Sequence, residues 1–325
     1  MNILLTGGAG YIGSHTALSL IDQGHQVTII DNLISGNENL VPSKANFFKI
    51  DIADKKKVQE ILKKNNFDLA MHFAGLVRVE ESVKYPEKYS LYNIEKAKIF
   101  FQCCFNSGLN KIIFSSTAGI YGKKENNTKV KEIDKLNPSN PYAETKLEIE
   151  KYLISLVLKK KINCIILRYF NVAGADEKKR SGLTSINSNN LIKVICEVAA
   201  NKRKKIIING NNYETKDGTP IRDFIHVSDL AEMHVIAAQD IYTNNKSDIF
   251  NCGYGEGYSV KEVIIEMTKI LNNKIAYEVG PRRENDISYS VADNAKFKNK
   301  FNWNPKHNNL NYILTSALEW EKTLA

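Results

Sequence analysis

The sequence predicts an α/β fold in which a doubly wound parallel sheet is joined to a smaller α/β domain. Three observations lead to this prediction. Apolar runs of strand length alternate with apolar patterns of helical spacing through the first half of the chain. A glycine-rich turn joins the first run to the first helical pattern, and an acidic residue ends the second run. The alternation stops near residue 172, so we place the large domain at 1–172 and the smaller, interleaved domain at 173–325.

The first element is a strand over 2–6, followed by a turn that contains Gly7, Gly10 and Gly13 and by a helix over 11–23. Glycine permits backbone conformations closed to a residue with a Cβ, a close approach to a pyrophosphate, and tight packing of the helix on its strand. The N–H groups at the helix start then face the anion. The turn therefore predicts a Rossmann dinucleotide site.

The second strand, over 26–30, ends at Asp31. A carboxylate at this strand end suits the two hydroxyls of an adenosine ribose and repels a 2′-phosphate. The alternative interpretation is a solvated loop aspartate. With the glycines upstream, we predict a site for NAD rather than NADP.

The remaining elements continue the alternation and then lose it. Asp51-Ile52 and Phe73-Ala74-Gly75 follow the third and fourth strands, at the sheet edge where ligands of parallel sheets bind. A polar loop is predicted over 176–189. The other predicted strands are 46–50, 68–73, 111–116, 163–168, 205–209 and 248–251, and the other predicted helices are 54–65, 86–107, 141–160, 190–201, 228–240, 260–271 and 310–322.

Two of these helices, 86–107 and 141–160, carry apolar residues on more than one face. Such faces can pair with their copies in a homodimer as a four-helix bundle. Burial within a single chain is the alternative interpretation.

The composition limits the class of protein. Hydrophobic residues make up 43% of the chain, enough for a sizeable core, and no apolar run reaches the ~18 residues of a membrane span. The first strand leads straight into the glycine turn, so we expect no cleavable leader. The cysteines lack Cys-x-x-Cys spacing, which favours buried reduced thiols in the cytoplasm over disulfides or a metal site. They are Cys103, Cys104, Cys164, Cys196 and Cys252.

The net charge of +9 comes mostly from lysine clusters such as 159–161 and 202–205. A solvated surface explains these clusters, because the interleaved aromatic residues of a nucleic-acid interface are missing from the sequence. We therefore expect no nucleic-acid partner. The positive balance also suits an anionic substrate.

Candidate catalytic groups follow the strand over 111–116. Thr117 lies at its tip, and Tyr142 and Lys146 lie four residues apart on one face of the helix that Pro141 begins. A phenol is a poor base at neutral pH, but a fixed ammonium and a positive nicotinamide ring favour the phenolate. We predict Tyr142 as the base, Lys146 as its electrostatic support, and Thr117 as a group that shares the proton of a substrate hydroxyl.

A series of motifs from residue 1 to about residue 322 resembles the extended short-chain dehydrogenase/reductase family, and within it the enzymes that epimerise UDP-hexoses at C4. The motifs are Gly-Gly-Ala-Gly-Tyr-Ile-Gly-Ser-His at 7–15, Asp31-Asn32-Leu33, His72-Phe73-Ala74-Gly75, Tyr142-x-x-x-Lys146, the run from Arg168 to Ala175, Asp217-Gly218-Thr219, the run from Arg222 to Val227, and Pro281-Arg282-Arg283.

The resemblance implies a tightly held NAD+ and a UDP-hexose that is oxidised to a 4-keto sugar, turned over and reduced again. It implies NAD contacts, besides the glycines, at Tyr11, Ile12, Asp31, Asn32, Asp51, Ile52, Phe73, Ala74, Gly75, Asn93, Tyr142, Lys146 and Phe170. It implies substrate contacts at Thr117, Asn171, Asn190, Leu191, Arg222, Arg283 and Asp286. Arg222 and Arg283 would hold the pyrophosphate, because guanidinium groups suit phosphate oxygens. For Arg222 the alternative is a surface ion pair with Asp223.

Substrate range is expected to depend on Ser290. Matching from Arg283 places it beside the 2-substituent of the sugar, where a tyrosine in the family restricts the enzyme to plain hexoses and a small residue admits an N-acetyl group. The resemblance therefore implies UDP-GlcNAc and UDP-GalNAc as substrates besides UDP-Glc and UDP-Gal. Tyr289 is one residue away, so this expectation depends on the register.

The chain departs from the family pattern at Val77, Glu95-Lys96, Gly119 and Asn209. Family dehydratases carry Asp-Glu directly after the strand threonine, where this chain has Ala118-Gly119, so dehydration is disfavoured. Another nucleotide-sugar enzyme, a decarboxylase or reductase, is one alternative function. An NAD-binding regulator without catalysis is the other, and the intact catalytic residues argue against it.

Overall fold

The computed structural model describes residues 1–124, 127–186, 188–283 and 286–324. Its backbone contacts divide the chain into two compact units. The first contains residues 1–120, 138–168 and 231–250, and the second contains 121–137, 169–230 and 251–325. Each unit is described by itself.

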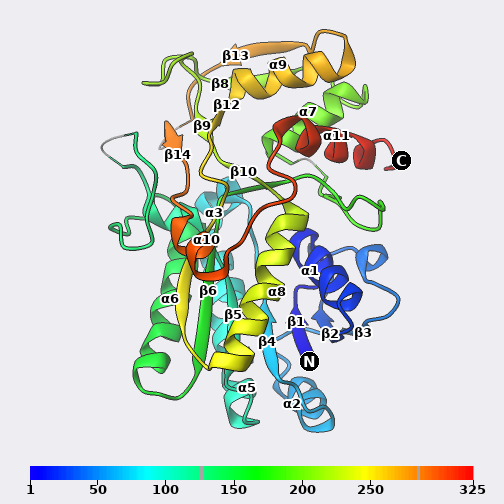
Figure 1. Ribbon diagram of the computed structural model, residues 1–325, viewed down its shortest axis with the longest axis vertical. Helices are drawn as coiled ribbons and strands as arrows, with labels where there is room; N and C mark the ends of the chain where they lie inside the picture. The colour runs from blue at the N-terminus through cyan, green and yellow to red at the C-terminus, as the bar shows by residue number, and fades with distance from the viewer. Residues whose placement is uncertain (125–126, 187, 284–285, 325) are drawn as a thin grey trace. The chain divides into compact units, whose positions relative to one another are not determined.

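The first unit is built on a seven-stranded sheet with the order β11-β6-β5-β4-β1-β2-β3 (Figure 1). The pairs β1–β2, β1–β4, β2–β3 and β4–β5 are parallel. The strands β2 and β3 are added on one side of β1, and β4, β5 and β6 are then added on its other side. This order confirms the predicted doubly wound fold. The strands are β1 (Asn2–Thr6), β2 (Gln26–Asp31), β3 (Asn46–Lys49), β4 (Leu69–His72), β5 (Lys111–Thr117), β6 (Asn163–Tyr169) and β11 (Asp248–Cys252).

Helices cover both faces of this sheet. A single apolar cluster joins α2 (Lys55–Lys64), α5 (Lys96–Asn106) and α6 (Pro141–Leu158) to alternate strand residues such as Leu4 and Ile112, so these helices share one face. The neighbouring strand residues Ile3, Leu5 and Ile29 are fully buried on the other face, where α1 (Tyr11–Asp22) packs on β1 and β2. Apart from α5, which is the last part of a longer predicted helix, these strands and helices differ from the predicted ones only at their ends.

The helix predicted over 86–107 is present as a continuous helical run over 86–106, made of α4 (Pro86–Ser90), a π-helical turn η2 (Leu91–Glu95) and α5. The π turn and the short helix α3 (Val79–Lys84) before this run were not predicted. The turn carries Asn93, whose buried amide bonds to both backbone groups of Leu76. A π turn in a helical run frequently marks a functional site. Its irregular hydrogen bonding leaves no trace in an apolar pattern.

The second unit contains several short sheets. β7 (Asn171–Ala173) pairs with β10 (Phe224–His226), and β8 (Ile206–Asn209) pairs with β13 (Tyr277–Gly280). β9 (Ile221–Arg222) lies between β12 (Tyr258–Ser259) and β14 (Tyr289–Ser290). Strands of two or three residues are too short to produce a period in the sequence, so the sequence analysis predicted only β8 among these.

The helices of the second unit are α7 (Leu191–Ala199), α9 (Val260–Leu271), α10 (Ala295–Phe301) and α11 (Leu310–Glu321), while α8 (Val227–Asn244) runs from the second unit into the first. Short 3-10 turns lie at η1 (Glu38–Leu40) and η3 (Ala118–Tyr121). The helices predicted near 190–201, 228–240, 260–271 and 310–322 are confirmed, and α10 was not predicted. The described part of 176–189 contains no helix or strand, as expected of a loop.

Two compositional expectations can be compared with the structure. All five cysteines are buried thiols rather than disulfides, which confirms that part of the prediction. Within the residues that the structure describes, every helix is too short or too polar to cross a membrane.

Candidate active site

The glycine turn packs closely against the loop that follows β4. Gly7 has a φ of +73°, and a Cβ on it would lie 2.5 Å from the backbone nitrogen of Ala74. A Cβ on Gly13 would lie 2.3 Å from the carbonyl oxygen of Gly7. Only glycine fits at these two positions, and α1 starts at this turn from Gly10 without a side-chain cap. The carboxyl end of β1 is therefore shaped for a close ligand.

Asp31 ends β2 beside this turn and is only 8% exposed. One carboxylate oxygen accepts a hydrogen bond from the N–H of Ala9 at 3.0 Å, and the other accepts from the N–H of Leu33 at 2.8 Å. Burial raises the pKa of this carboxyl group, and the two hydrogen bonds act against the rise. The alternative of a solvated aspartate is wrong, because the carboxylate is built into the glycine turn.

Asp51 forms a second acidic position at the same edge of the sheet. Its Oδ2 accepts from Lys96 Nζ at 2.5 Å and from Asn32 Nδ2 at 3.0 Å, and its Oδ1 accepts from the N–H of Ala53 at 2.9 Å. Burial acts to raise the pKa of Asp51, but the Lys96 ammonium and these hydrogen bonds hold it below its usual value. Ile52, the next residue, is buried.

The loop after β4 completes this edge. A Cβ on Gly75 would lie 3.0 Å from Oδ1 of Asn93, and the ring of Phe73 lies 5.0 Å from the ring of His234. Asn93 also donates to Thr145 Oγ1 at 3.1 Å, which joins η2 to α6. A Cβ-free turn, an uncapped helix start and a buried acidic strand end fit a dinucleotide without a 2′-phosphate.

Thr117, Tyr142 and Lys146 come together at the tip of β5. The hydroxyl groups of Tyr142 and Thr117 are hydrogen-bonded, and Thr117 Oγ1 also accepts from the N–H of Gly119 at 3.1 Å. Lys146 is buried, and its Nζ donates to the carbonyl of Ser115 at 2.8 Å. The predicted tyrosine–lysine pair therefore faces a strand hydroxyl within one unit.

Burial shifts both titrating groups of this pair. It raises the pKa of Tyr142 to about 12, against the hydrogen bond from Thr117. It lowers the pKa of Lys146 to about 8, while the carboxylate of Glu150 acts to raise it. The phenol is thus protonated at neutral pH in the protein alone, and added positive charge beside it would favour the phenolate.

In the second unit, Arg222 pairs with Asp286 rather than with its neighbour Asp223. Arg222 Nη2 lies 2.7 Å from Asp286 Oδ1, and Tyr213 donates its hydroxyl to Asp286 Oδ2 at 2.9 Å. The guanidinium of Arg282 lies over the Tyr213 ring, 3.9 Å from its centroid. The alternative interpretation, a surface ion pair between Arg222 and Asp223, is therefore wrong. The carboxylate of Asp223 is instead fully buried and accepts three backbone N–H groups.

Ser290 lies in register with Arg222 on the neighbouring strand, and Tyr289 lies in register with Ile221. Residues in register on parallel strands share a face, and the two neighbours point to opposite faces. Ser290, not Tyr289, therefore shares the face of Arg222.

The other predicted residues of the second unit come from different elements. Asn190 caps α7, just before Leu191, by accepting from the N–H of Lys193 at 3.2 Å. Asn171 donates its N–H to the carbonyl of Asp223 at 2.9 Å, and Phe170 is buried. Arg283 is exposed, and its carbonyl accepts from the N–H of Asp286.

Tyr213, Lys96, Glu150 and Arg168 contact predicted site residues or lie beside them but were not among the predicted site residues. Tyr213 and Lys96 each bind a predicted acidic residue from a distant part of the chain, and the sequence offers no local signal for them. Glu150 and Arg168 form a buried ion pair next to the catalytic groups, with Nη2 and Oε2 2.7 Å apart. Glu150 could have been found, because it lies four residues after Lys146 on the same helical face.

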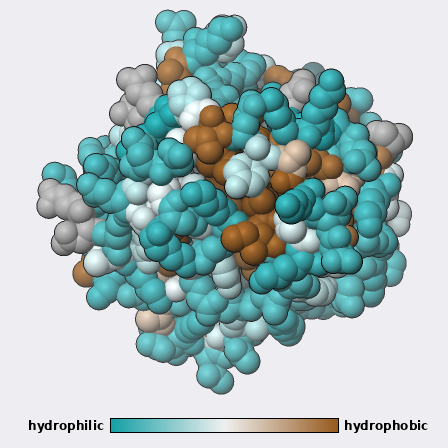
Figure 2. All heavy atoms as spheres, turned by 90° about the horizontal axis from the view of Figure 1, so that it is seen from above, coloured by the Kyte–Doolittle hydropathy of each residue, from teal (hydrophilic) through white to brown (hydrophobic). Residues whose placement is uncertain are grey.

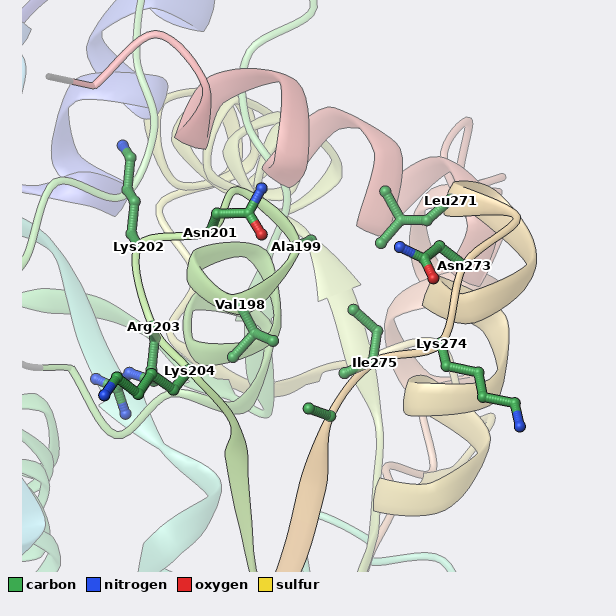
Figure 3. A pocket seen from close by; sticks show the side chains of 11 residues that line it. Val198, Ala199, Asn201, Lys202, Arg203, Lys204, Leu271, Asn273, Lys274 and Ile275 are labelled. Carbon is green, nitrogen blue, oxygen red and sulfur yellow. The ribbon is translucent and has the colours of Figure 1, made fainter.

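The second unit also contains a pocket of about 580 Å³ that is separate from the predicted site residues (Figure 3). It is lined by residues at the C-terminal ends of α7 and α9, such as Val198, and by residues of the segments that follow these helices, such as Lys202 and Ile275. None of the predicted site residues lines it. Lys202 donates a hydrogen bond to the carbonyl of Glu321 at 2.8 Å.

Figure 2 shows hydrophobic side chains gathered in one hollow of the face seen from above, with hydrophilic ones around it.

The fold and the cofactor-shaped edge of the sheet define a dinucleotide-dependent α/β protein. A sequence model of the "NAD dependent epimerase/dehydratase family" matches residues 3–253. The chain belongs to this family.

Full-length relatives support the same assignment. A UDP-glucose 4-epimerase from Azospirillum brasilense is 38% identical over 322 residues, covering 99% of this chain and 92% of the relative. The solved structure of a UDP-Glc/GlcNAc 4-epimerase from Campylobacter jejuni is 41% identical with a TM-score of 0.85, covering 99% of each chain. That of a UDP-glucose 4-epimerase from Stenotrophomonas maltophila, with bound NAD and formylated UDP-arabinopyranose, is 32% identical with a TM-score of 0.95, covering 99% of this chain and 98% of the other.

Proposed function

We propose that this protein is an NAD-dependent epimerase that interconverts UDP-hexoses at C4 through a transient 4-keto sugar. One observation carries the proposal: Tyr142, Thr117 and Lys146 lie together at the tip of β5. They belong to the same unit as the glycine turn. Full-length relatives named UDP-glucose 4-epimerase support it.

Most of the residues that would hold NAD follow the carboxyl ends of β1 to β4, and the others come from η2, α6 and the segment after β6. Gly7, Gly10 and Gly13, with Tyr11 and Ile12 at the helix start, would hold the pyrophosphate. Asp31 would bind the adenosine ribose, and the further contacts would be Asn32, Asp51, Ile52, Phe73, Ala74, Gly75, Asn93, Tyr142, Lys146 and Phe170. When bound, NAD+ supplies the acceptor for the C4 hydrogen of the sugar and later returns it. We propose 1–172 as the NAD domain and 173–325 as the UDP-sugar domain.

The proton is handled by the chain's own residues. Tyr142 Oη would take the proton of the sugar 4-hydroxyl and later return it. Lys146 supports the phenolate through its charge, and Thr117 orients the substrate hydroxyl. Because burial raises the pKa of Tyr142 to about 12, this support is needed near neutral pH.

A 4-epimerase must hold the nucleotide firmly and the hexose loosely. Arg222 and Arg283 would bind the pyrophosphate, Asp286 the ribose, and Asn171, Asn190 and Leu191 the rest of UDP. Arg222 is already held by Asp286, so its guanidinium is oriented before a phosphate arrives. The hexose, bound by few groups, could turn over while UDP stays in place.

We further propose that UDP-N-acetylhexosamines are substrates, together with the UDP-hexoses. Ser290 shares a face with Arg222, and its small side chain leaves space for an N-acetyl group. The Campylobacter jejuni relative is named for both UDP-Glc and UDP-GlcNAc.

A homodimer in the cytoplasm completes the proposal. Apolar residues on α5 and α6, such as Phe105, Leu156 and Val157, pack against the core of the first unit but stay partly exposed, and we propose that their exposed parts pair with their copies. The buried thiols suit a reducing compartment.

The test is to incubate the purified protein with UDP-Gal, UDP-Glc, UDP-GalNAc and UDP-GlcNAc separately. We expect each C4 epimer to appear without net formation of NADH. Release of carbon dioxide from a uronate substrate would indicate a decarboxylase, and net consumption of NADH would indicate a reductase. Bound NAD without turnover of any UDP-sugar would indicate a regulator.

A further inference from the structure

A buried polar network lies behind the tyrosine–lysine pair, within the first unit. Glu150 is fully buried on α6, one turn after Lys146. Its carboxylate pairs with Arg168 on β6, with Nη2 to Oε2 at 2.7 Å and Nε to Oε1 at 3.1 Å. The same Oε1 accepts a short hydrogen bond from Ser116 Oγ on β5. One carboxylate therefore joins a helix and two strands.

Lys146 contacts the same strand one residue earlier, through its 2.8 Å hydrogen bond to the carbonyl of Ser115. Lys146 and Glu150 thus hold two adjacent residues of β5, directly before Thr117. Because Tyr142 lies on the same helix, these two bonds set the position of its hydroxyl relative to that of Thr117.

The network also supplies charge. A buried ammonium loses its hydration and needs a compensating negative group. The titratable or charged groups facing Lys146 are Tyr142 and Glu150 on α6, His72 at the end of β4, and Arg168 behind Glu150. Of these, Glu150 is the only carboxylate. Burial raises the pKa of the Tyr142 phenol to about 12, and burial together with the charge of Lys146 lowers the pKa of His72 to about 3.

We propose that Glu150 is a positioning residue for the tyrosine–lysine pair: it fixes α6 against β5 and maintains the positive charge of Lys146, while Arg168 holds the carboxylate in place. The inference rests on the proposed function, because that function gives the charge of Lys146 its task.

Two variants separate this role from simple structural support. Glu150→Gln and Arg168→Met each break the same buried ion pair, so both are expected to lower the melting temperature. The two variants differ in the charge next to Lys146. Glu150→Gln removes the negative charge of the carboxylate, whereas Arg168→Met leaves that carboxylate in place. Lysine labelled with ¹³C at Cε reports ionisation, and the Lys146 resonance is assigned by its absence from Lys146→Met.

We expect the titration midpoint of Lys146 to fall by about one pH unit in Glu150→Gln, since a nearby opposite charge shifts a pKa by about one to three units. It should not fall in Arg168→Met. The alkaline limit of kcat should move in the same direction, because the ammonium is the active form, while KM for UDP-Gal changes by less than about threefold.

If Glu150→Gln does not fold, the double variant with Arg168→Met leaves no unpaired buried charge and should show the same downward shift. An unchanged Lys146 midpoint in the variant that lacks the carboxylate, or equal shifts in both single variants, would overturn the proposal. A downward shift in a protein that turns over no UDP-hexose would support the link between Glu150 and Lys146 and would overturn the proposed function instead.

Discussion

The hydroxyl of Tyr213 donates a 2.9 Å hydrogen bond to Asp286, whose other oxygen accepts from Arg222 at 2.7 Å. Tyr213 is 4% exposed, and a Cβ on Gly210 would lie 3.1 Å from its ring. The tyrosine therefore joins the loop before Asp217-Gly218-Thr219 to the segment around Asp286. Tyr213 is the single aromatic residue between Asn209 and Thr219, and its side chain is buried.

Tyr213→Phe should weaken substrate binding without slowing the chemistry. The change removes a hydrogen bond to a charged carboxylate, so we expect KM for UDP-Gal to rise about tenfold and kcat to stay within about twofold. Steady-state kinetics measure both. Tyr277→Phe, at an exposed tyrosine of the same unit, is the matched control and should leave both constants unchanged. A fall in kcat with unchanged KM would contradict this role.

Tyr142→Phe should abolish epimerisation while leaving NAD bound. The phenyl ring fills the same space but cannot take the proton of the 4-hydroxyl, so kcat should fall about 10²- to 10⁴-fold. Coenzyme content after gel filtration, measured by absorbance of the released NAD, should match that of the wild type. Near-normal turnover would exclude Tyr142 as the base.

Lys96→Met should weaken coenzyme binding. Lys96 holds Asp51 in a partly buried pair, with side-chain exposures of 18% and 31%, at the sheet edge where NAD is proposed to bind. Loss of such a pair costs on the order of 1 kcal/mol, so the Kd for NAD should rise about fivefold. Lys98→Met, which breaks a more exposed pair with Glu148 on the neighbouring helix, is the matched control and should leave the Kd unchanged.

The same pair should make stability depend on acid pH. The pKa of Asp51 in the folded protein is lower than in the unfolded chain, because Lys96 and hydrogen bonds outweigh burial. Its contribution is therefore complete above the unfolded value and is lost as the pH falls through the folded value. The melting temperatures of the wild type and Lys96→Met should differ most near pH 7 and converge as the pH falls through the folded pKa of Asp51. A constant difference across this range would mean that Lys96 acts through packing alone.

The sequence predicted well those features that depend on the pattern of residues close together in the chain. The strands β1 to β6 are apolar runs, and Tyr142 and Lys146 are brought together by the helix that carries both. Asp31 reaches the glycine turn because adjacent parallel strands end at one edge of the sheet. Such relations follow from periodicity and topology, without knowledge of any particular contact.

The contacts that the sequence could not predict join distant residues. Lys96 and Asp51 are 45 positions apart, and Tyr213 and Asp286 are 73 apart. Within the π turn η2, the side-chain amide of Asn93 binds the backbone of Leu76, 17 positions earlier in the chain. Tertiary partners decide these features, and an apolar pattern carries no information about them.

Ser290→Tyr should remove activity on the N-acetylated substrates and preserve activity on the plain hexoses. Ser290 lies on the face of Arg222, so a tyrosine there would fill the space proposed for the N-acetyl group, and Ser290→Ala would keep it open. We expect kcat/KM for UDP-GlcNAc to fall at least about 100-fold in Ser290→Tyr, with UDP-Gal changed less than about threefold. Ser290→Ala should retain both activities. Parallel loss of both activities in Ser290→Tyr would indicate a distorted strand, and a wild type inactive on UDP-GlcNAc would refute the size argument itself.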